Sequence, residues 1–164
     1  MTDKFTQITG FTILPDETVI DLYGIPTLLL HGDSLCTDDI AHQQFRQAMT
    51  TNIQWQTQFL SLPIEERIQQ AKMARAQSQQ NQQALLNMET MDIMDTNEST
   101  VINTFKKHDV HSMIHGHTHR QQTHQHQTDG ITMTRTVLGD WGAKDSVLKV
   151  NAQGMSMINQ EIRV

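Results

Sequence analysis

The chain has 164 residues, 37% of them hydrophobic, and a formal net charge of -6, which suits one acidic domain with a real core. It has no lysine and arginine cluster of the kind that follows a nucleic-acid backbone, so nucleic acid is not expected as a partner. The single Cys36 cannot close an internal disulfide, and no run approaches the roughly 20 apolar residues of a membrane span. These features predict a cytoplasmic protein.

Two strands are the first elements expected along the chain, at residues 17–23 and 27–30, with the turn Gly24-Ile25-Pro26 between them. The second strand contains Leu28-Leu29-Leu30, an uninterrupted apolar run typical of a strand buried on both faces. It ends at His31-Gly32-Asp33. Polar groups just beyond such a strand end commonly form a site, although one histidine beside a glycine is weak evidence alone.

The middle of the chain, residues 38–107, is rich in Gln, Met and Ala and predicts helices with one break at Pro63. Thr96-Asn97-Glu98 provides an N-cap for a last helix, in which Val101, Ile102 and Phe105 share one face. Lys106, Lys107 and His108 suit the last turn of that helix, where positive charge is favourable.

The β pattern then returns, at residues 110–114, 131–138, 146–150 and 155–164. The order of elements is strands, a helical block, one more helix and strands. This order favours an α/β layered domain that carries a helical insertion.

A second group of histidines follows the third expected strand. His117-Thr118-His119 comes directly after Gly116, which permits a tight turn, so both imidazoles can point into one cleft. Together with His31 they form a candidate partial shell for Mn, Fe or Zn. Spacing alone leaves open whether they are ligands, because histidines are frequent here. His124 and His126, in a segment that reads as a polar loop, are expected to be solvated.

Three stretches of the chain resemble the UDP-2,3-diacylglucosamine pyrophosphohydrolases, a branch of the calcineurin-like metallophosphoesterase superfamily. They are the nine residues from His31 to Asp39, the stretch from Ile114 to Arg120, and residues 137–141. The Gly-His-Thr-His loop is general to the superfamily, whereas the nine-residue stretch and Ile93-Met94-Asp95 are particular to this branch. The likeness covers essentially the whole chain.

This resemblance implies the C-terminal part of a four-layered αββα fold, with residues 1–164 forming a partial metallophosphoesterase domain and residues 40–95 a helical cap that holds the acyl chains. It also implies a centre of two manganese ions. His31 and His117 would bind one ion and His119 the other, while His115 would be a neighbour and not a ligand.

The resemblance places substrate contacts at Asp39, at Ser78 and at His117, which also lies close to the substrate phosphate. Arg75 and Asn81 lie near Ser78 in the sequence and join this group. The family has an Asn four residues after that Ser and a Lys three further on. This chain has Gln82 and no lysine between 72 and 106, so its head-group contacts are expected to differ.

The implied reaction is hydrolysis of the pyrophosphate bond of UDP-2,3-diacylglucosamine in lipid A biosynthesis. Water activated by the two metal ions attacks the α-phosphorus, and the products are 2,3-diacylglucosamine 1-phosphate and UMP. The implied location is the cytoplasm, in peripheral contact with the inner membrane.

The family pattern begins with an Asp-x-His strand end, a Gly-Asp and a Gly-Asn turn, and none of these occurs near Met1. The first strands of the sheet and four of the seven metal ligands are therefore expected to be missing, and Asp109-Val110-His111 is expected to be incidental. We expect a truncated, inactive and marginally folded chain that holds at most one metal ion weakly, with Leu28 to Leu30 on an unpaired edge.

Two alternatives stay open. One is another calcineurin-like phosphoesterase with a smaller substrate, which the long helical block disfavours. The other is a non-catalytic lipid-binding remnant that keeps the cap. In the block, Trp55, Phe59, Leu60, Leu62, Ile64, Ile68 and Met73 could cover acyl chains or simply pack against the rest of the domain.

Overall fold

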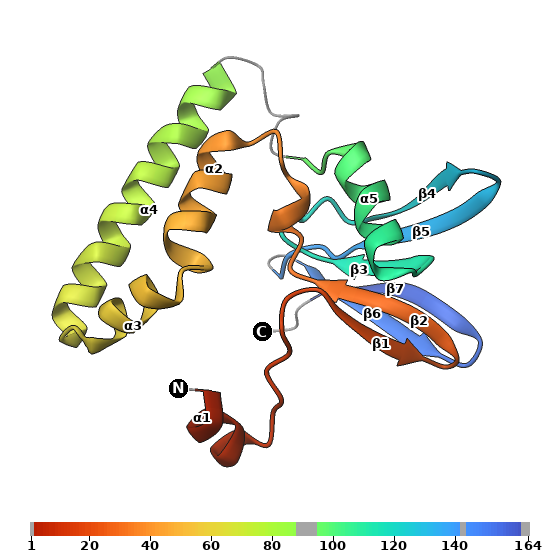
Figure 1. Ribbon diagram of the computed structural model, residues 1–164, viewed down its shortest axis with the longest axis horizontal. Helices are drawn as coiled ribbons and strands as arrows, with labels where there is room; N and C mark the ends of the chain where they lie inside the picture. The colour runs from red at the N-terminus through yellow and green to blue at the C-terminus, as the bar shows by residue number, and fades with distance from the viewer. Residues whose placement is uncertain (1, 88–94, 142–143, 162–164) are drawn as a thin grey trace. The chain divides into compact units, whose positions relative to one another are not determined.

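The computed structural model describes residues 2–87, 95–141 and 144–161 (Figure 1). Two compact units are present, one formed by residues 1–33 with 98–164 and the other by residues 34–97. Among the described residues, no helix is both long enough and apolar enough to cross a membrane.

The first unit is built on a five-stranded mixed sheet in the order β1-β2-β3-β5-β4 (Figure 1). The strands are β1 Thr18–Leu22, β2 Ile25–Leu30, β3 Ser112–His115, β4 Gln122–Thr128 and β5 Ile131–Val137. The two inner pairs, β2 with β3 and β3 with β5, are parallel, and the two outer pairs are antiparallel. The predicted α/β class is confirmed.

Helix α5, Glu98–His108, begins within the predicted cap segment and buries Val101 and Phe105, with the expected basic residues in its last turn. The core contains these two side chains together with Leu28, Met113 and Val137, all at most 1% exposed. Helix α1, Thr2–Thr9, precedes the sheet.

Strand β2 lies inside the sheet. Leu28 pairs with Val19 of β1 on one side and with Met113 of β3 on the other. The prediction of an unpaired edge at Leu28 to Leu30 is therefore wrong. The reason is local, because Tyr23 and Gly24 both have positive φ, 55° and 86°. Two such residues form the type of tight turn that folds β1 back onto β2 as a hairpin.

Strand β4 was not predicted, because Gln122–Thr128 is polar throughout. It is an edge strand that pairs only with β5 among the described residues, and a tight turn at Asp129 and Gly130, with φ of 55° and 77°, joins the two. An Asp-Gly pair is a strong hairpin signal, and it was the one clue to this strand in the sequence.

The last two strands, β6 Lys144–Asn151 and β7 Gly154–Glu161, form a separate antiparallel hairpin. Gly139 N donates to Ser146 Oγ at 2.9 Å, and Trp141 Nε1 donates to the Ser146 carbonyl at 3.0 Å. A cavity of about 400 Å³ with mostly apolar walls lies between this hairpin and the end of the sheet, with Ile114 and Leu138 on one side and Val147 and Leu148 on the other.

The second unit is helical, as predicted for this part of the chain. A short 3-10 turn, η1 Asp33–Leu35, leads to α2 Ile40–Phe45, the π-helical turn η2 Arg46–Thr50, α3 Ile53–Ser61 and α4 Ile64–Asn87, and Pro63 separates the last two. Asn52 caps α3 by accepting from Trp55 N at 3.0 Å. Many apolar side chains of these helices are exposed, among them Ile53 (77%) and Met73 (73%).

Candidate metal centre

The topology brings His31 and His117 together. His31 follows β2 directly and His117 comes two residues after β3, and these strands are parallel neighbours in which Leu30 is opposite His115. The two imidazole centroids are 5.0 Å apart, with the rings tilted by 60°. Two imidazoles bound to one ion through bonds of about 2.1 Å have centroids roughly 5 Å apart. This pair therefore fits a shared metal ion.

His31 is held through its backbone and through its ring. Its N–H donates to Asp16 Oδ1 at 3.3 Å, and its carbonyl accepts from Gly116 N at 3.0 Å. The ring Nδ1 lies 3.1 Å from Asp33 Oδ1, while 64% of the side chain is exposed. A carboxylate beside one ring nitrogen is a common neighbour of a metal-binding histidine.

The loop after β3 has a strained backbone. His117 and His119 have φ of 65° and 55°, values that residues other than glycine seldom adopt. Such conformations cost about 1–3 kcal/mol each and are found in tight turns, as at Tyr23 and Asp129, as well as at functional sites. Thr118 N donates to the Gly116 carbonyl at 2.8 Å, whereas Thr118 Oγ1 is buried without a hydrogen-bond partner in the described part of the chain. The two features make this loop a candidate site.

His119 is exposed, and the described residues contain no group of three or more His, Cys, Asp or Glu side chains placed to hold one ion. The pair of His31 and His117 is therefore the part of the predicted shell that the fold assembles. The assignment of His119 to a second ion stays a prediction.

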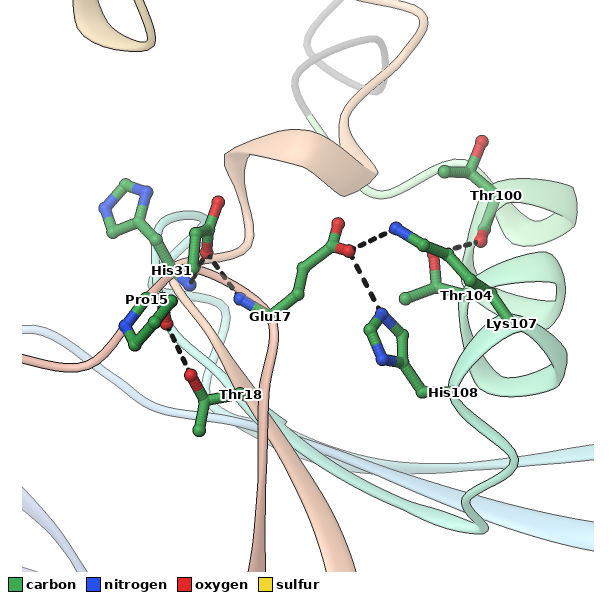
Figure 2. Close-up of polar contacts among 9 residues, drawn as sticks. Pro15, Glu17, Thr18, His31, Thr100, Thr104, Lys107 and His108 are labelled. Carbon is green, nitrogen blue, oxygen red and sulfur yellow. Dashed lines mark hydrogen bonds and ion pairs between the residues drawn. The ribbon is translucent and has the colours of Figure 1, made fainter. Parts of the chain in front are cut away.

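The segment before β1 is anchored next to His31. Glu17 Oε2 accepts from His108 Nε2 at 3.0 Å and from Lys107 Nζ, and Figure 2 shows both side chains reaching it from α5. The hydrogen bond from Lys107 holds the pKa of Glu17 below its ordinary value, although burial acts in the opposite direction. Glu17 N also donates to Asp16 Oδ1, the oxygen that accepts from His31 N. The end of α5 is thus linked to the backbone of His31.

Apart from His117, the predicted substrate contacts lie in the helical unit. Asp39 is the N-cap of α2, since its Oδ1 accepts from His42 N at 2.9 Å. Arg75 and Ser78 are exposed on α4, and Asn81 lies further along the same helix. Their roles stay predictions, and Ile93 and Met94, two residues of one family stretch, lie outside the described residues.

Sequence reasoning missed the side chains buried beneath the loop. His126 is 5% exposed, so the expectation that it is solvated is wrong, and His124 is half-buried. His126 lies in a hydrogen-bonded chain with Glu98, Arg135 and His115. Because Gln122–Thr128 is polar throughout, its sequence does not show that the His126 side chain points inward. Only the Asp129-Gly130 turn could have indicated a strand there.

No family model matches the chain. Curated relatives do match it. The UDP-2,3-diacylglucosamine hydrolase of Xanthomonas campestris pv. campestris (strain ATCC 33913) is 47% identical over 156 residues, which is 93% of this chain and 63% of that protein. The hydrolases of the same name from Xanthomonas oryzae pv. oryzae (strain PXO99A) and Stenotrophomonas maltophilia (strain K279a) are also 47% identical, over 160 and 158 residues.

The match covers 94% of this chain in both of these cases, and 64% and 63% of the relatives' lengths. The chain thus spans somewhat less than two thirds of the curated relatives it matches. Over nearly all of its own length, the chain is a homologue of the UDP-2,3-diacylglucosamine hydrolases.

Proposed function

We propose that the chain is part of an enzyme that hydrolyses the pyrophosphate bond of UDP-2,3-diacylglucosamine to 2,3-diacylglucosamine 1-phosphate and UMP, in lipid A biosynthesis. The observation that carries this proposal is the pairing of His31 and His117 at 5.0 Å, at the ends of adjacent parallel strands. The 47% identity to relatives named for this substrate supports it. We also propose the four-layered αββα arrangement of the family for the complete protein.

His31 and His117 would hold one manganese ion, and His119 would contribute to a second. Bound divalent ions supply an activated water and neutralise charge on the phosphoryl oxygens. The chain itself places Asp33 beside His31 and joins the two backbone segments through the hydrogen bond from Gly116 N to the His31 carbonyl. Neutral imidazoles bring no negative charge to offset a divalent cation, so we propose that this chain alone takes up at most one ion, and weakly.

The helical unit would act as the cap over the acyl chains. This proposed cap role is supported by the exposed apolar side chains on α3 and α4, including Ile53, Ile64 (59%) and Met73. Trp55 and Phe59 stack on one another, with centroids 4.9 Å apart. Exposed apolar surface of this kind suits lipid. The same surface would bring the protein into peripheral contact with the cytoplasmic face of the inner membrane.

The metal assignment can be tested in a chimera in which this chain replaces the matching region of the Xanthomonas campestris hydrolase. His31→Ala, His117→Ala and His119→Ala should each remove most of the manganese-dependent turnover. His111→Ala is the matched control, because His111 is exposed and lies outside the loop. Turnover within about twofold of the parent in these three variants would contradict the assignment.

The substrate class is tested in the same chimera by comparing UDP-2,3-diacylglucosamine with UDP-glucosamine that carries no acyl chains. We expect far faster cleavage of the acylated substrate, because binding energy from remote acyl contacts helps to position the reacting phosphate. Similar rates on both would favour the phosphoesterase with a small substrate. Binding of the acylated substrate without cleavage would favour the lipid-binding remnant.

A further inference from the structure

Four side chains from four elements form a continuous hydrogen-bonded chain beneath the histidine loop. Arg135 of β5 occupies its centre, with Nη1 3.0 Å from His115 Nε2 and Nε 3.3 Å from His126 Nε2. At one end, His115 Nδ1 lies 2.9 Å from the Gly116 carbonyl oxygen. At the other, His126 Nδ1 lies 2.7 Å from Glu98 Oε1 at the start of α5. The elements concerned, β3, β5, β4 and α5, all belong to the first unit (Figure 1).

The centre of this chain is removed from water. Arg135 and His126 are each 5% exposed and His115 is 1% exposed, whereas the Glu98 side chain is 66% exposed. Burial of a guanidinium is costly unless its N–H groups are hydrogen-bonded. The two buried imidazoles supply acceptors for these N–H groups.

The chemistry of arginine fixes the direction of every bond. A guanidinium has donors and no acceptor, so the Nε2 atoms of His115 and His126 must both accept and carry no hydrogen. Each ring then carries its hydrogen on Nδ1. His115 therefore donates to the Gly116 carbonyl and His126 donates to the Glu98 carboxylate, and both acceptors are of the right kind.

The Gly116 peptide receives this bond at the point where the loop begins. Its carbonyl accepts from His115 Nδ1 and from Thr118 N, and its N–H donates to the His31 carbonyl. Three hydrogen bonds thus hold Gly116, which is hydrogen-bonded to the backbone of His31 and directly precedes His117 in the chain. The space beside His115 is equally restricted, since a Cβ on Gly32 would lie 2.6 Å from His115 Nδ1.

We propose that His115 is a positioning residue, held in its Nδ1–H form by Arg135, that fixes the Gly116 carbonyl and thereby the placement of His117 relative to His31. This inference deepens the proposed function and rests on its assignment of His31 and His117 as a metal pair. Arg135, His126 and Glu98 act through His115.

The form of the rings can be read directly by NMR of the intact chain labelled with ¹⁵N-histidine, because the shifts of the two ring nitrogens distinguish the tautomers. We expect His115 and His126 to carry hydrogen on Nδ1, and each signal is assigned by its loss in the matching single variant. An Nε2–H ring at His115 would overturn the proposal, since such a ring cannot accept from Arg135 and donate to Gly116 together.

A pair of substitutions then separates the two bonds of His115. The amide nitrogen of His115→Asn stands where Nδ1 was and can still donate to Gly116, whereas the carbonyl oxygen of His115→Gln stands where Nε2 was and can only accept from Arg135. Each variant loses one hydrogen bond and a ring, so their melting temperatures should fall by similar amounts. His111→Gln is the control for an exposed histidine.

Loop position is read without metal from the backbone amide resonances of His117 and Thr118. They should stay near their parent positions in the Asn variant and move in the Gln variant, and equal displacement in both would overturn the proposal. Manganese affinity, measured by electron paramagnetic resonance, should fall about tenfold or more in the Gln variant and less in the Asn variant, as expected for a group that orients a ligand. If neither the parent chain nor the chimera takes up manganese, the metal assignment fails, while the amide resonances still decide the role of His115.

Discussion

Replacement of Gly32 by alanine tests the packing beneath the histidine loop in one step. Gly32 has φ of 111°, and a Cβ there would lie 2.6 Å from His115 Nδ1 and 3.1 Å from the Gly116 carbonyl oxygen. Both neighbours are fixed, because His115 is buried and the Gly116 carbonyl accepts two hydrogen bonds. The new methyl group must therefore displace the His115 ring or the loop.

The expected loss of stability has two parts. The backbone strain of alanine at this φ costs about 1–3 kcal/mol. Displacement of His115 takes one hydrogen bond from the buried Arg135, and a buried group without its partner costs about 1–3 kcal/mol. The Gly116 carbonyl keeps its bond from Thr118 N. The sum of strain and the lost bond is about 2–6 kcal/mol, a large part of the 5–15 kcal/mol by which domains are usually stable.

The control for this experiment is Gly24→Ala, in the turn between β1 and β2. Gly24 also has positive φ, 86°, but a Cβ there would meet nothing within 4 Å. Only strain remains in that variant, about 1–2 kcal/mol. Urea unfolding of both variants gives the two free energies. If Gly32→Ala is destabilised no more than Gly24→Ala, the contact between Gly32 and His115 does not exist as described.

Three further predictions concern the first unit. The stabilising effect of Glu17 should be full above the ordinary glutamate pKa of 4.5 and should fade as the pH falls through its lowered folded pKa, so the unfolding free energies of the parent and Glu17→Gln should converge in acid. Phe105→Ala should cost about 3–5 kcal/mol in urea unfolding, because Phe105 is fully buried. His126→Ala should lower the melting temperature well below that of His111→Ala, since it leaves Arg135 and Glu98 without a shared partner.

The sequence predicted those elements whose pattern is set by burial. The apolar run at Leu28 to Leu30 predicted a buried strand, and the face shared by Val101 and Phe105 predicted α5, which begins within the predicted cap segment. The proximity of His31 and His117 could also be anticipated, because polar residues at the ends of two buried strands meet when the strands are parallel neighbours.

The errors concern features that depend on partners far away in the sequence. Strand β4 has no apolar alternation, because its one buried side chain is His126, and a buried histidine is recognisable only once Arg135 and Glu98 are seen on either side of it. The unpaired edge was expected because β2 was assumed to pair with the first strands of the family pattern. The hairpin at Tyr23 and Gly24 supplies a partner from within the chain.

In the candidate centre, hydrogen bonds hold the backbone, whereas the His31 ring is exposed. Backbone hydrogen bonds fix His31 through Asp16 and Gly116, and a buried chain of side chains from Arg135 supports the same glycine. The His31 side chain, in contrast, is 64% exposed and meets one carboxylate, Asp33. A binding site gains affinity when its groups are held in place before the ligand arrives. These residues therefore hold the backbone of the proposed histidine pair in place from one side and leave the His31 ring accessible to a ligand.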